Sequence, residues 1–446
     1  MKFNKQLFYS ILICSFGLVF STYIFYPGFI SFDSFSQYEQ LSSGAYSNAH
    51  PAMMTRVWAI ADKLIKGPGG IFLLHQFMYW LGISFIIRSF RFNSFYSTLA
   101  GLALGFFPPY YLISLHIWKD AAMLAGLSLF TGLYLHMKSK GPLSSQSRGV
   151  LAVMLVSLTY ALGVRHNSVL ATIPLFYLIG RELLKANGLE KDLNGVMKAT
   201  ALSVILFVSS LTATKLVNSY KVRKGKLFPM IYVWDMAAIS LKEKQVLLPD
   251  EIILEKVDTL NKLEKVFRNN VNNTISSVVS FYPQKNYIPY WLELIGRYPS
   301  SYFAHRNKVF AELITIDREM AYYPFHPGID EDPFKKRNFR SRVMPTVYYE
   351  IINLARWLSG TFIYKAFLYL ILSIGLISWF LYKYLARKSF SESYFIAGIF
   401  GLSGALYVLP LYFFAPASDF RYNVWMIFLS ILGAIIAALE KKKLYK

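Results

Sequence analysis

The chain contains only one cysteine, Cys14, among its 446 residues. This cysteine lies inside an apolar run, so it cannot form an internal disulfide and carries no information about the redox compartment. Two common zinc-binding spacings, His-Glu-x-x-His and Cys-x-x-Cys, are also missing from the sequence. No internal repeat and no low-complexity linker divides the chain. Neither a disulfide framework nor a metal motif is therefore available to define the function.

Acidic residues are scarce as well. The chain has 25 Asp and Glu against 47 Lys and Arg, and its net charge is +22. Nucleic acid is a poor explanation for this excess, because no basic face stands apart from the apolar runs. Basic loops beside anionic lipid or a lipid-linked phosphate explain it better.

Apolar residues, in contrast, are abundant, at 55% of the chain, and the mean hydropathy is +0.37. Apolar runs of about 17–25 residues recur along the sequence, which is the length that crosses a bilayer as a helix. These features predict an all-α polytopic membrane protein rather than a soluble globule. About ten spans are expected, at residues 7–26, 71–88, 95–115, 119–137, 149–164, 167–184, 197–216, 361–384, 391–414 and 421–440.

The first run is interpreted as a retained helix. It is too long for a signal peptide, and no small-x-small cleavage site precedes Pro27. Basic connections between the spans set the expected orientation, because cytoplasmic loops are rich in Lys and Arg. With a cytoplasmic N-terminus, every short cytoplasmic connection is basic, and so is the tail, residues 440–446. These basic residues are Arg88, Arg91, Lys138, Lys140, Arg148, Arg181, Lys185, Lys191, Lys198, Lys383, Arg387 and Lys388.

This orientation divides the chain into three expected parts. Residues 1–216 form an N-terminal membrane module of seven helices, which includes an external loop at 27–70. Residues 217–360 form an external, mostly helical domain inserted between helices seven and eight, and residues 361–446 form a C-terminal module of three helices. Within the external domain, residues 250–267 show apolar spacings of three and four, which predict a helix. Residues 287–314 mix aromatic residues with cations, which suits a helix in the membrane interface.

Polar motifs gather at the external ends of the expected spans. They are Asp33 in "YPGFISFDSFSQ", His50 and Pro51, the Trp118-Lys119-Asp120 triplet, Arg165 to Asn167, and Asp419 to Tyr422. Ionisable side chains are costly in a membrane, and independent loop residues would scatter over both faces. Their common face therefore predicts that these motifs converge on one polar site.

Each motif also has a local interpretation, which the sequence leaves open. In order along the chain, these are a solvated loop acid or helix N-cap at Asp33, a turn at His50, an ion pair between Lys119 and Asp120, a snorkelling turn at Arg165 and His166, and an ion pair between Arg421 and Asp419.

The order of these motifs resembles the GT-C superfamily of membrane glycosyltransferases. The likeness is closest to little-characterised bacterial members with S-x-D-S-x-x-Q, His-Pro, Trp-Lys-Asp, Arg-x-Asn and Asp-x-Arg-Tyr motifs. In this chain these begin at Ser31, His50, Trp118, Arg165 and Asp419, and the stretch "WDMAAISLKEKQVLLPDE" also looks like theirs. The usual pair of adjacent acids in the first loop is absent, since only Asp33 stands there. The catalytic base and the use of a metal therefore stay open.

The resemblance implies transfer of a sugar from a polyprenyl-phosphate donor to a hydroxyl of a cell-envelope glycan or lipid. It implies a bacterial inner membrane, both termini in the cytoplasm, an active site on the periplasmic face and an inverting displacement. No cofactor is required by it, and a divalent metal ion is left open. The implied roles are Asp33 as base with Asp120 as a second acid; Lys119, Arg165, His166, Arg421 and His50 at the donor phosphate; and Gln37, Asn167, Tyr422 and Trp118 at the substrate.

Two other classes compete with a glycosyltransferase. A polymerase or ligase of lipid-linked glycans also works outside the membrane with basic loops, but it needs no polyprenyl-monophosphate donor. A transporter or flippase is typically built from internal repeats with charges near the middle of the membrane. The chain shows no such repeat, and its polar motifs lie at one face.

Overall fold

The computed structural model describes residues 5–47, 50–90, 94–140, 148–185, 193–223, 228–317, 324–339, 345–387 and 391–439. Nearly all of its regular structure in these ranges is helical. The exception is a short parallel pair, in which β1 (Tyr46–Ser47) bonds to β2 (Val222–Arg223). Of the basic residues used to orient the chain, Arg91, Lys191, Lys388 and the tail 440–446 lie outside the described residues.

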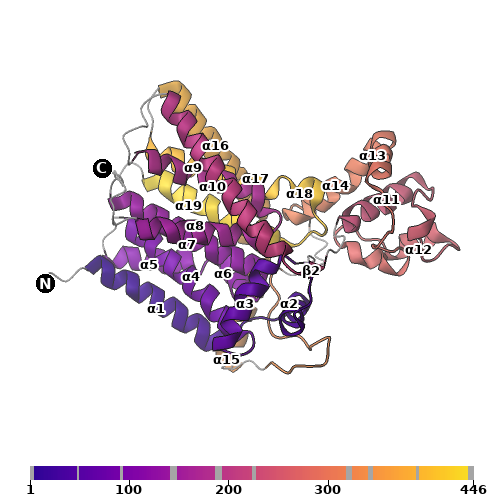
Figure 1. Ribbon diagram of the computed structural model, residues 1–446, viewed down its shortest axis with the longest axis horizontal. Helices are drawn as coiled ribbons and strands as arrows, with labels where there is room; N and C mark the ends of the chain where they lie inside the picture. The colour runs from indigo at the N-terminus through magenta and orange to yellow at the C-terminus, as the bar shows by residue number, and fades with distance from the viewer. Residues whose placement is uncertain are drawn as a thin grey trace.

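A bundle of long apolar helices forms the larger part of the molecule (Figure 1). It contains α1 (Lys5–Phe25), α4 (Gly69–Ser89), α5 (Ser94–Gly105), α6 (Pro108–Ser114), α7 (Lys119–Lys140), α8 (Arg148–Gly163), α9 (Ser168–Lys185), α10 (Leu193–Ser219), α16 (Ala366–Arg387), α17 (Glu392–Val408), α18 (Leu411–Phe414) and α19 (Val424–Leu439). The first residues of α1 and the last residues of α19 lie at one end of this bundle, and the remaining helices are attached to the other end.

Six of the described segments are long and apolar enough to cross a membrane. These are Leu7–Phe25, Gly69–Ser89, Asn194–Ser219, Ala366–Ala386, Glu392–Phe414 and Phe420–Leu439. The helical structure and these apolar segments are thus those expected of a membrane protein. Of the other expected spans, the one at 149–164 corresponds to the apolar but shorter α8, and α7 carries charged residues at both ends.

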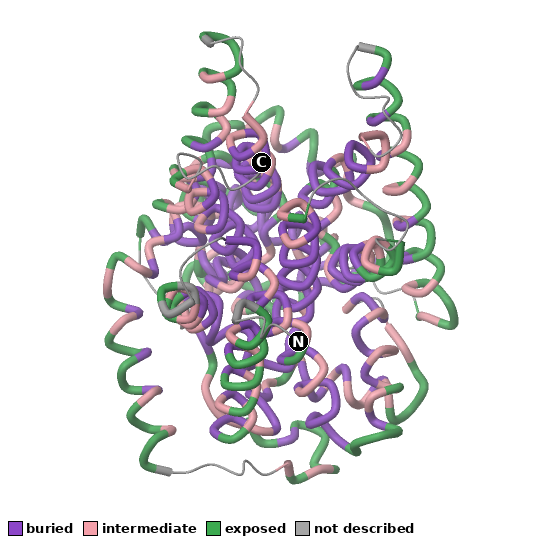
Figure 2. The backbone as a smooth tube through the Cα atoms, turned by 90° about the vertical axis from the view of Figure 1, so that its left-hand side faces the viewer, coloured by how far each residue is buried: buried purple, intermediate pink, exposed green. Residues whose placement is uncertain are grey.

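Burial separates a central group of helices from a peripheral group (Figure 2). Most of α4, α17 and α19 is buried, whereas only a minor part of α1, α10 and α16 is buried. The contact between α4 and α7 depends on two glycines. A Cβ atom at Gly132 would lie 2.3 Å from the carbonyl oxygen of Gly82, so only glycine allows this approach. This close packing fixes α7, whose first residues are Lys119 and Asp120.

Two expected spans are interrupted by proline. The span at 95–115 divides into α5 and α6, with Phe107 preceding Pro108 at the start of α6. The span at 391–414 divides into α17 and α18 around Pro410. Phe107 has extended backbone, as expected of a residue that precedes a proline. Leu409 keeps helical backbone, so the break at Pro410 follows from the missing N–H group of the proline. Both breaks lie toward the end of the bundle that carries the additional helices.

The expected loop 27–70 is itself mostly helical. It contains α2 (Phe32–Ser43) and α3 (Ala52–Leu64). Ser31 occupies the N-cap position of α2, and its N–H donates to the Ser34 hydroxyl oxygen at 3.2 Å. Asp33 lies within the first turn and is not the N-cap, so the capping interpretation of Asp33 is wrong.

A lobe formed by α11 to α14 projects from the same end of the bundle (Figure 1). Its helices are α11 (Pro229–Glu243), η2 (Asp250–Ile252), α12 (Thr259–Val266), η3 (Asn272–Ser277), α13 (Ile288–Arg297) and α14 (Pro299–Leu313). The helix predicted over 250–267 is wrong in extent, because only η2 and α12 are helical there. Residues 287–314 do form helices, α13 and α14, which Pro299 separates.

Not all of the segment 217–360 belongs to this lobe. The helix α15 (Pro345–Ser359) lies beside the end of α1, and the Tyr348 ring is 6.0 Å from the Phe25 ring. A short helix, η4 (Phe362–Tyr364), then leads into α16. The first part of the segment 217–360 therefore forms the lobe, and its last part packs against the bundle before the last three long helices begin.

Candidate active site

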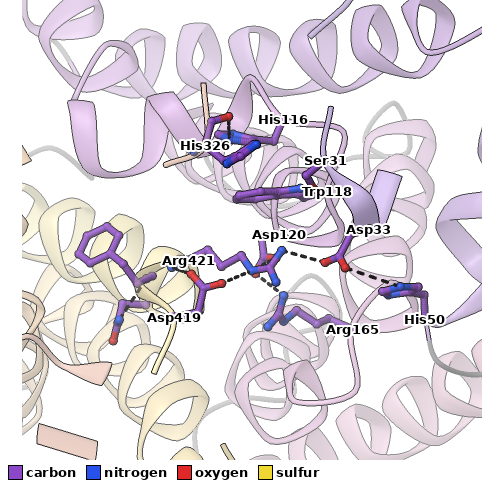
Figure 3. A network of polar contacts seen from close by, with 12 residues as sticks. Ser31, Asp33, His50, His116, Trp118, Asp120, Arg165, His326, Asp419 and Arg421 are labelled. Carbon is purple, nitrogen blue, oxygen red and sulfur yellow. Dashed lines mark hydrogen bonds and ion pairs between the residues drawn. The ribbon is translucent and has the colours of Figure 1, made fainter. Parts of the chain in front are cut away.

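Polar side chains from five separate parts of the chain meet where the lobe joins the bundle (Figure 3). They come from the first turn of α2, the loop before α3, the start of α7, the turn between α8 and α9, and η5 (Phe420–Asn423) with the residue before it. We call this group the charged cluster. Its members are Asp33, His50, Lys119, Asp120, Arg165, Asp419 and Arg421. The predicted convergence of the polar motifs is therefore present in the fold.

Asp33 pairs with a residue from the far end of the sequence. Its Oδ2 atom accepts a hydrogen bond from Arg421 Nη1 at 3.0 Å. Its Oδ1 atom lies 3.9 Å from His50 Nε2. The Asp33 side chain is 26% exposed, so it is partly open to solvent while its charge is balanced by a guanidinium group.

The charge state of Asp33 follows from this arrangement. Burial alone would raise the pKa of the Asp33 carboxyl group, because it disfavours the ionised form. The positive charges of Arg421 and Lys119, together with the hydrogen bond from Arg421, outweigh burial and hold this pKa well below its usual range. Asp33 is therefore an ionised carboxylate at neutral pH.

Arg421 is shared between several groups. Its Nε atom lies 2.7 Å from Asp419 Oδ2 and 3.9 Å from Asp120 Oδ2. Its guanidinium carbon lies 4.5 Å from the centre of the Trp118 ring, in a cation–π contact. The local pairing with Asp419 thus exists, but it does not replace the contact with Asp33. Burial raises the pKa of Asp419, although the Arg421 charge opposes this effect.

Asp120 and Arg165 form a second ion pair. The Asp120 side chain is completely buried, and Arg165 Nη1 donates a short hydrogen bond to its Oδ1 atom. Arg165 also lies 4.5 Å from the Tyr422 ring, and its Nε atom donates to Asn167 Oδ1 at 3.0 Å. The predicted local pair between Lys119 and Asp120 is absent from the described structure. Arg165 instead points inward, so its interpretation as a snorkelling turn is wrong.

His50 and Lys119 complete the charged cluster. Burial and the neighbouring Lys119 charge lower the pKa of His50 to about 3, so this imidazole is neutral at physiological pH. Its Nδ1 atom is buried and has no hydrogen-bond partner among the described residues. Lys119 begins α7 and interacts electrostatically with Asp33. No described residue forms an ion pair with its ammonium group, in contrast to both arginines.

Some predicted site residues lie beside the cluster rather than in it. Gln37 is fully buried, donates to the Asp33 carbonyl oxygen at 3.3 Å and accepts from Thr55 of α3. It therefore joins α2 to α3. His166 is exposed on the turn between α8 and α9. Tyr422 and Trp118 are buried and supply the aromatic faces beneath Arg165 and Arg421.

His116 and residues 324–330 have no role predicted from the sequence, yet they lie next to the charged cluster. The His116 ring stacks on Trp118 at 3.8 Å, so Trp118 lies between His116 and Arg421 (Figure 3). The His326 N–H donates to His116 Nε2 at 3.0 Å. One signal was available, because His326 begins a second His-Pro dipeptide in the chain.

The side chains of the charged cluster are not arranged as metal ligands. Across the described ranges, no group of three or more His, Cys, Asp and Glu side chains is arranged to hold a metal. Each of the three carboxylates of the cluster faces a guanidinium group, with Arg421 shared between Asp33 and Asp419. Every carboxylate of the cluster therefore already has an arginine partner, and we derive no chemical step through a metal.

Comparisons with protein-family models, curated proteins and solved structures found no match. The resemblance to GT-C glycosyltransferases therefore rests on the motifs of the sequence, and the function has to be argued from the geometry of the charged cluster.

Proposed function

We propose that the protein is a membrane glycosyltransferase of the GT-C type, which transfers a sugar from a polyprenyl-phosphate donor to an acceptor hydroxyl. One observation carries this proposal. Asp33 is a partly exposed, ionised carboxylate that lies beside the cations Arg421 and Lys119 at the end of a bundle of apolar helices. A carboxylate and adjacent cations are the two kinds of group that this reaction needs.

The carboxylate has a defined role in the reaction. The acceptor oxygen forms a bond to the anomeric carbon while the bond from that carbon to the phosphate oxygen breaks. The acceptor proton passes to Asp33, and the bonding electron pair leaves with the phosphate. Proton transfer to a positioned carboxylate typically contributes 10²–10⁴-fold to the rate. A single displacement of this kind inverts the anomeric centre.

The cations act on the leaving group. Lys119, Arg165 and Arg421 lie where negative charge develops on the departing phosphate, and such charges stabilise the transition state. Both arginines already face carboxylates, so Lys119 is the cation most available to a donor phosphate. Neutral His50 contributes a hydrogen bond rather than a charge. Asp120 remains the second candidate for the base, although its burial against Arg165 favours Asp33.

The membrane arrangement is part of the same proposal. We infer that the other four expected spans, at residues 95–115, 119–137, 149–164 and 167–184, cross the membrane with the six long apolar segments, which makes about ten spans. The lobe and the charged cluster then lie outside, in the periplasm of a bacterium, and both termini lie in the cytoplasm. The end of the bundle opposite the lobe carries Lys138, Arg181 and Lys185, which supports this orientation.

The test is turnover by the purified protein, supplied with polyprenyl-phosphate sugars and cell-envelope acceptors. We expect release of polyprenyl phosphate and a glycosylated product of inverted configuration. The Asp33→Asn variant should fold normally and bind the donor, but it should lose roughly 10²-fold or more in rate, because an amide cannot accept the proton.

A matched control is Glu293→Gln, which removes an exposed carboxylate of the lobe and should leave turnover unchanged. Activity of Asp33→Asn within a few-fold of wild type would remove Asp33 from the mechanism and move the role to Asp120. Activity only with pyrophosphate-linked or oligosaccharide donors would instead identify a polymerase or ligase.

A further inference from the structure

Buried polar contacts connect the core of the lobe to the backbone that precedes Asp419 and Arg421 of the charged cluster. Arg306 of α14 is fully buried, and its Nη2 atom donates to Asp235 of α11 at 2.7 Å. Asp235 is also fully buried and accepts a second hydrogen bond, from Trp291 Nε1 at 3.1 Å. A charged pair inside a lobe of this size is costly unless its hydrogen bonds are satisfied. Its position therefore requires an explanation.

The Arg306 guanidinium group also contacts a residue outside the lobe. Its Nη1 atom donates to the carbonyl oxygen of Ala415 at 2.9 Å. Ala415 follows α18 and begins the connection to η5, which carries Asp419 and Arg421. Asp235 thus orients a guanidinium group whose second contact is the backbone that leads into the charged cluster.

Further contacts hold the same connection against the lobe. The Ser418 N–H donates to the Asn270 carbonyl oxygen at 2.9 Å, and the Ser418 hydroxyl donates to the Val309 carbonyl oxygen at 2.8 Å. Beyond Arg421, the Asn423 side chain donates to the Leu313 carbonyl oxygen at 2.8 Å. The connection 415–423 is therefore attached to the lobe on both sides of Arg421.

We propose that Arg306 is a positioning residue, which holds the connection 415–423 on the lobe so that Arg421 stays against Asp33. The lobe then acts as a support for the charged cluster. The link to catalysis rests on the proposed function, whereas the positioning itself does not.

The experiment measures backbone amide exchange and turnover on the full-length protein in detergent. Arg306→Met removes the bond to Ala415 but leaves Asp235 buried without its cation, so a double variant, Asp235→Leu with Arg306→Met, removes both charges of the pair. In the double variant we expect amide exchange in peptides that cover 415–423 to be roughly tenfold faster than in wild type. The reason is that this connection loses one hydrogen bond from a charged donor. Exchange in α12 should stay as in wild type.

The functional measurement compares the change in kcat with the change in the KM for the donor. A displaced Arg421 should lower kcat, and Arg306→Lys should recover part of the loss because lysine can still reach one of the two partners. Arg297→Met, an exposed arginine of the same lobe, is the control and should change neither readout.

Unchanged exchange of 415–423 in the double variant would overturn the positioning role. Faster exchange there with unchanged kcat would overturn its link to catalysis. If the wild-type protein shows no transfer at all, the proposed function fails, and the exchange comparison still decides the positioning role.

Discussion

Arg421 determines what Asp33 can do at a given pH. The Asp33 carboxyl group is partly buried, which by itself would favour its protonated form. Its ion pair with Arg421 reverses that effect and extends the ionised range of Asp33 to lower pH. A base acts only above its own pKa, so the pairing keeps the proposed enzyme active in mild acid.

This relation predicts the pH profile of an Arg421→Met variant. Without the cation the pKa of Asp33 should rise by roughly 1–3 units, which is the usual effect of an opposite charge on a carboxylate. The acid limb of the kcat/KM profile should therefore move to higher pH, and relative activity should fall more at pH 4 than at pH 8. The measurement is kcat/KM between pH 4 and 9, with Arg297→Met as control. A uniform loss at every pH would mean that Arg421 does not set the charge state of Asp33.

The residues of the cluster could be found from the sequence, but their long-range partners could not. Asp33, Asp120, Arg165 and Arg421 were identified because charges at span ends are rare and share one face. Pairing between near neighbours in sequence was one interpretation of these motifs, and it holds for Arg421 with Asp419 but not for Lys119 with Asp120. Asp120 pairs across 45 positions with Arg165, and Asp33 pairs across 388 positions with Arg421. Such pairs depend on helix packing, which the charge pattern does not encode.

Among the elements, the expected spans coincide with helices because long apolar runs have few alternatives in a membrane. The prolines at 108 and 410 were visible in the sequence, yet hydropathy alone predicted continuous spans there. The helix expected over 250–267 failed for another reason. Its apolar spacing suits a helix, but Asp258 adopts left-handed backbone with φ of 58°, which interrupts it before α12.

The contact between α4 and α7 gives a prediction at this scale. Gly132→Ala should destabilise the protein, because the added Cβ atom would meet the Gly82 backbone at 2.3 Å. Gly375→Ala in α16 has nothing within 4 Å of its Cβ atom, so it should be neutral or stabilising by about 0.5–1 kcal/mol, since alanine favours helix. Thermal unfolding in detergent compares the two variants. Equal transition temperatures would show that α4 and α7 separate easily.

At the scale of the whole molecule, the lobe and the charged cluster lie at the end of the bundle opposite the start of α1 (Figure 1). The orientation that we propose for this axis in the membrane is based on basic residues such as Lys140 at the other end. We therefore expect Lys262 of the lobe to face outward and Lys140 to face the cytoplasm.

Single cysteines introduced as Lys140→Cys and Lys262→Cys, in a Cys14→Ser background, report this orientation. An impermeant thiol reagent applied to intact cells should label the Lys262→Cys variant only. Both should react once the cells are opened, which controls for accessibility. Labelling of Lys140→Cys alone in intact cells would reverse the orientation.

The distance along the chain between Asp33 and Arg421 also has a consequence in time. The ribosome makes Arg421 388 residues after Asp33, when most of the bundle has already been synthesised. Until then Asp33 lacks the guanidinium group with which it pairs. The lobe is also synthesised before the connection 415–423, which it supports. The charged cluster is therefore one of the last parts of the protein to form. Newly made chains should remain inactive until their final helix is in place.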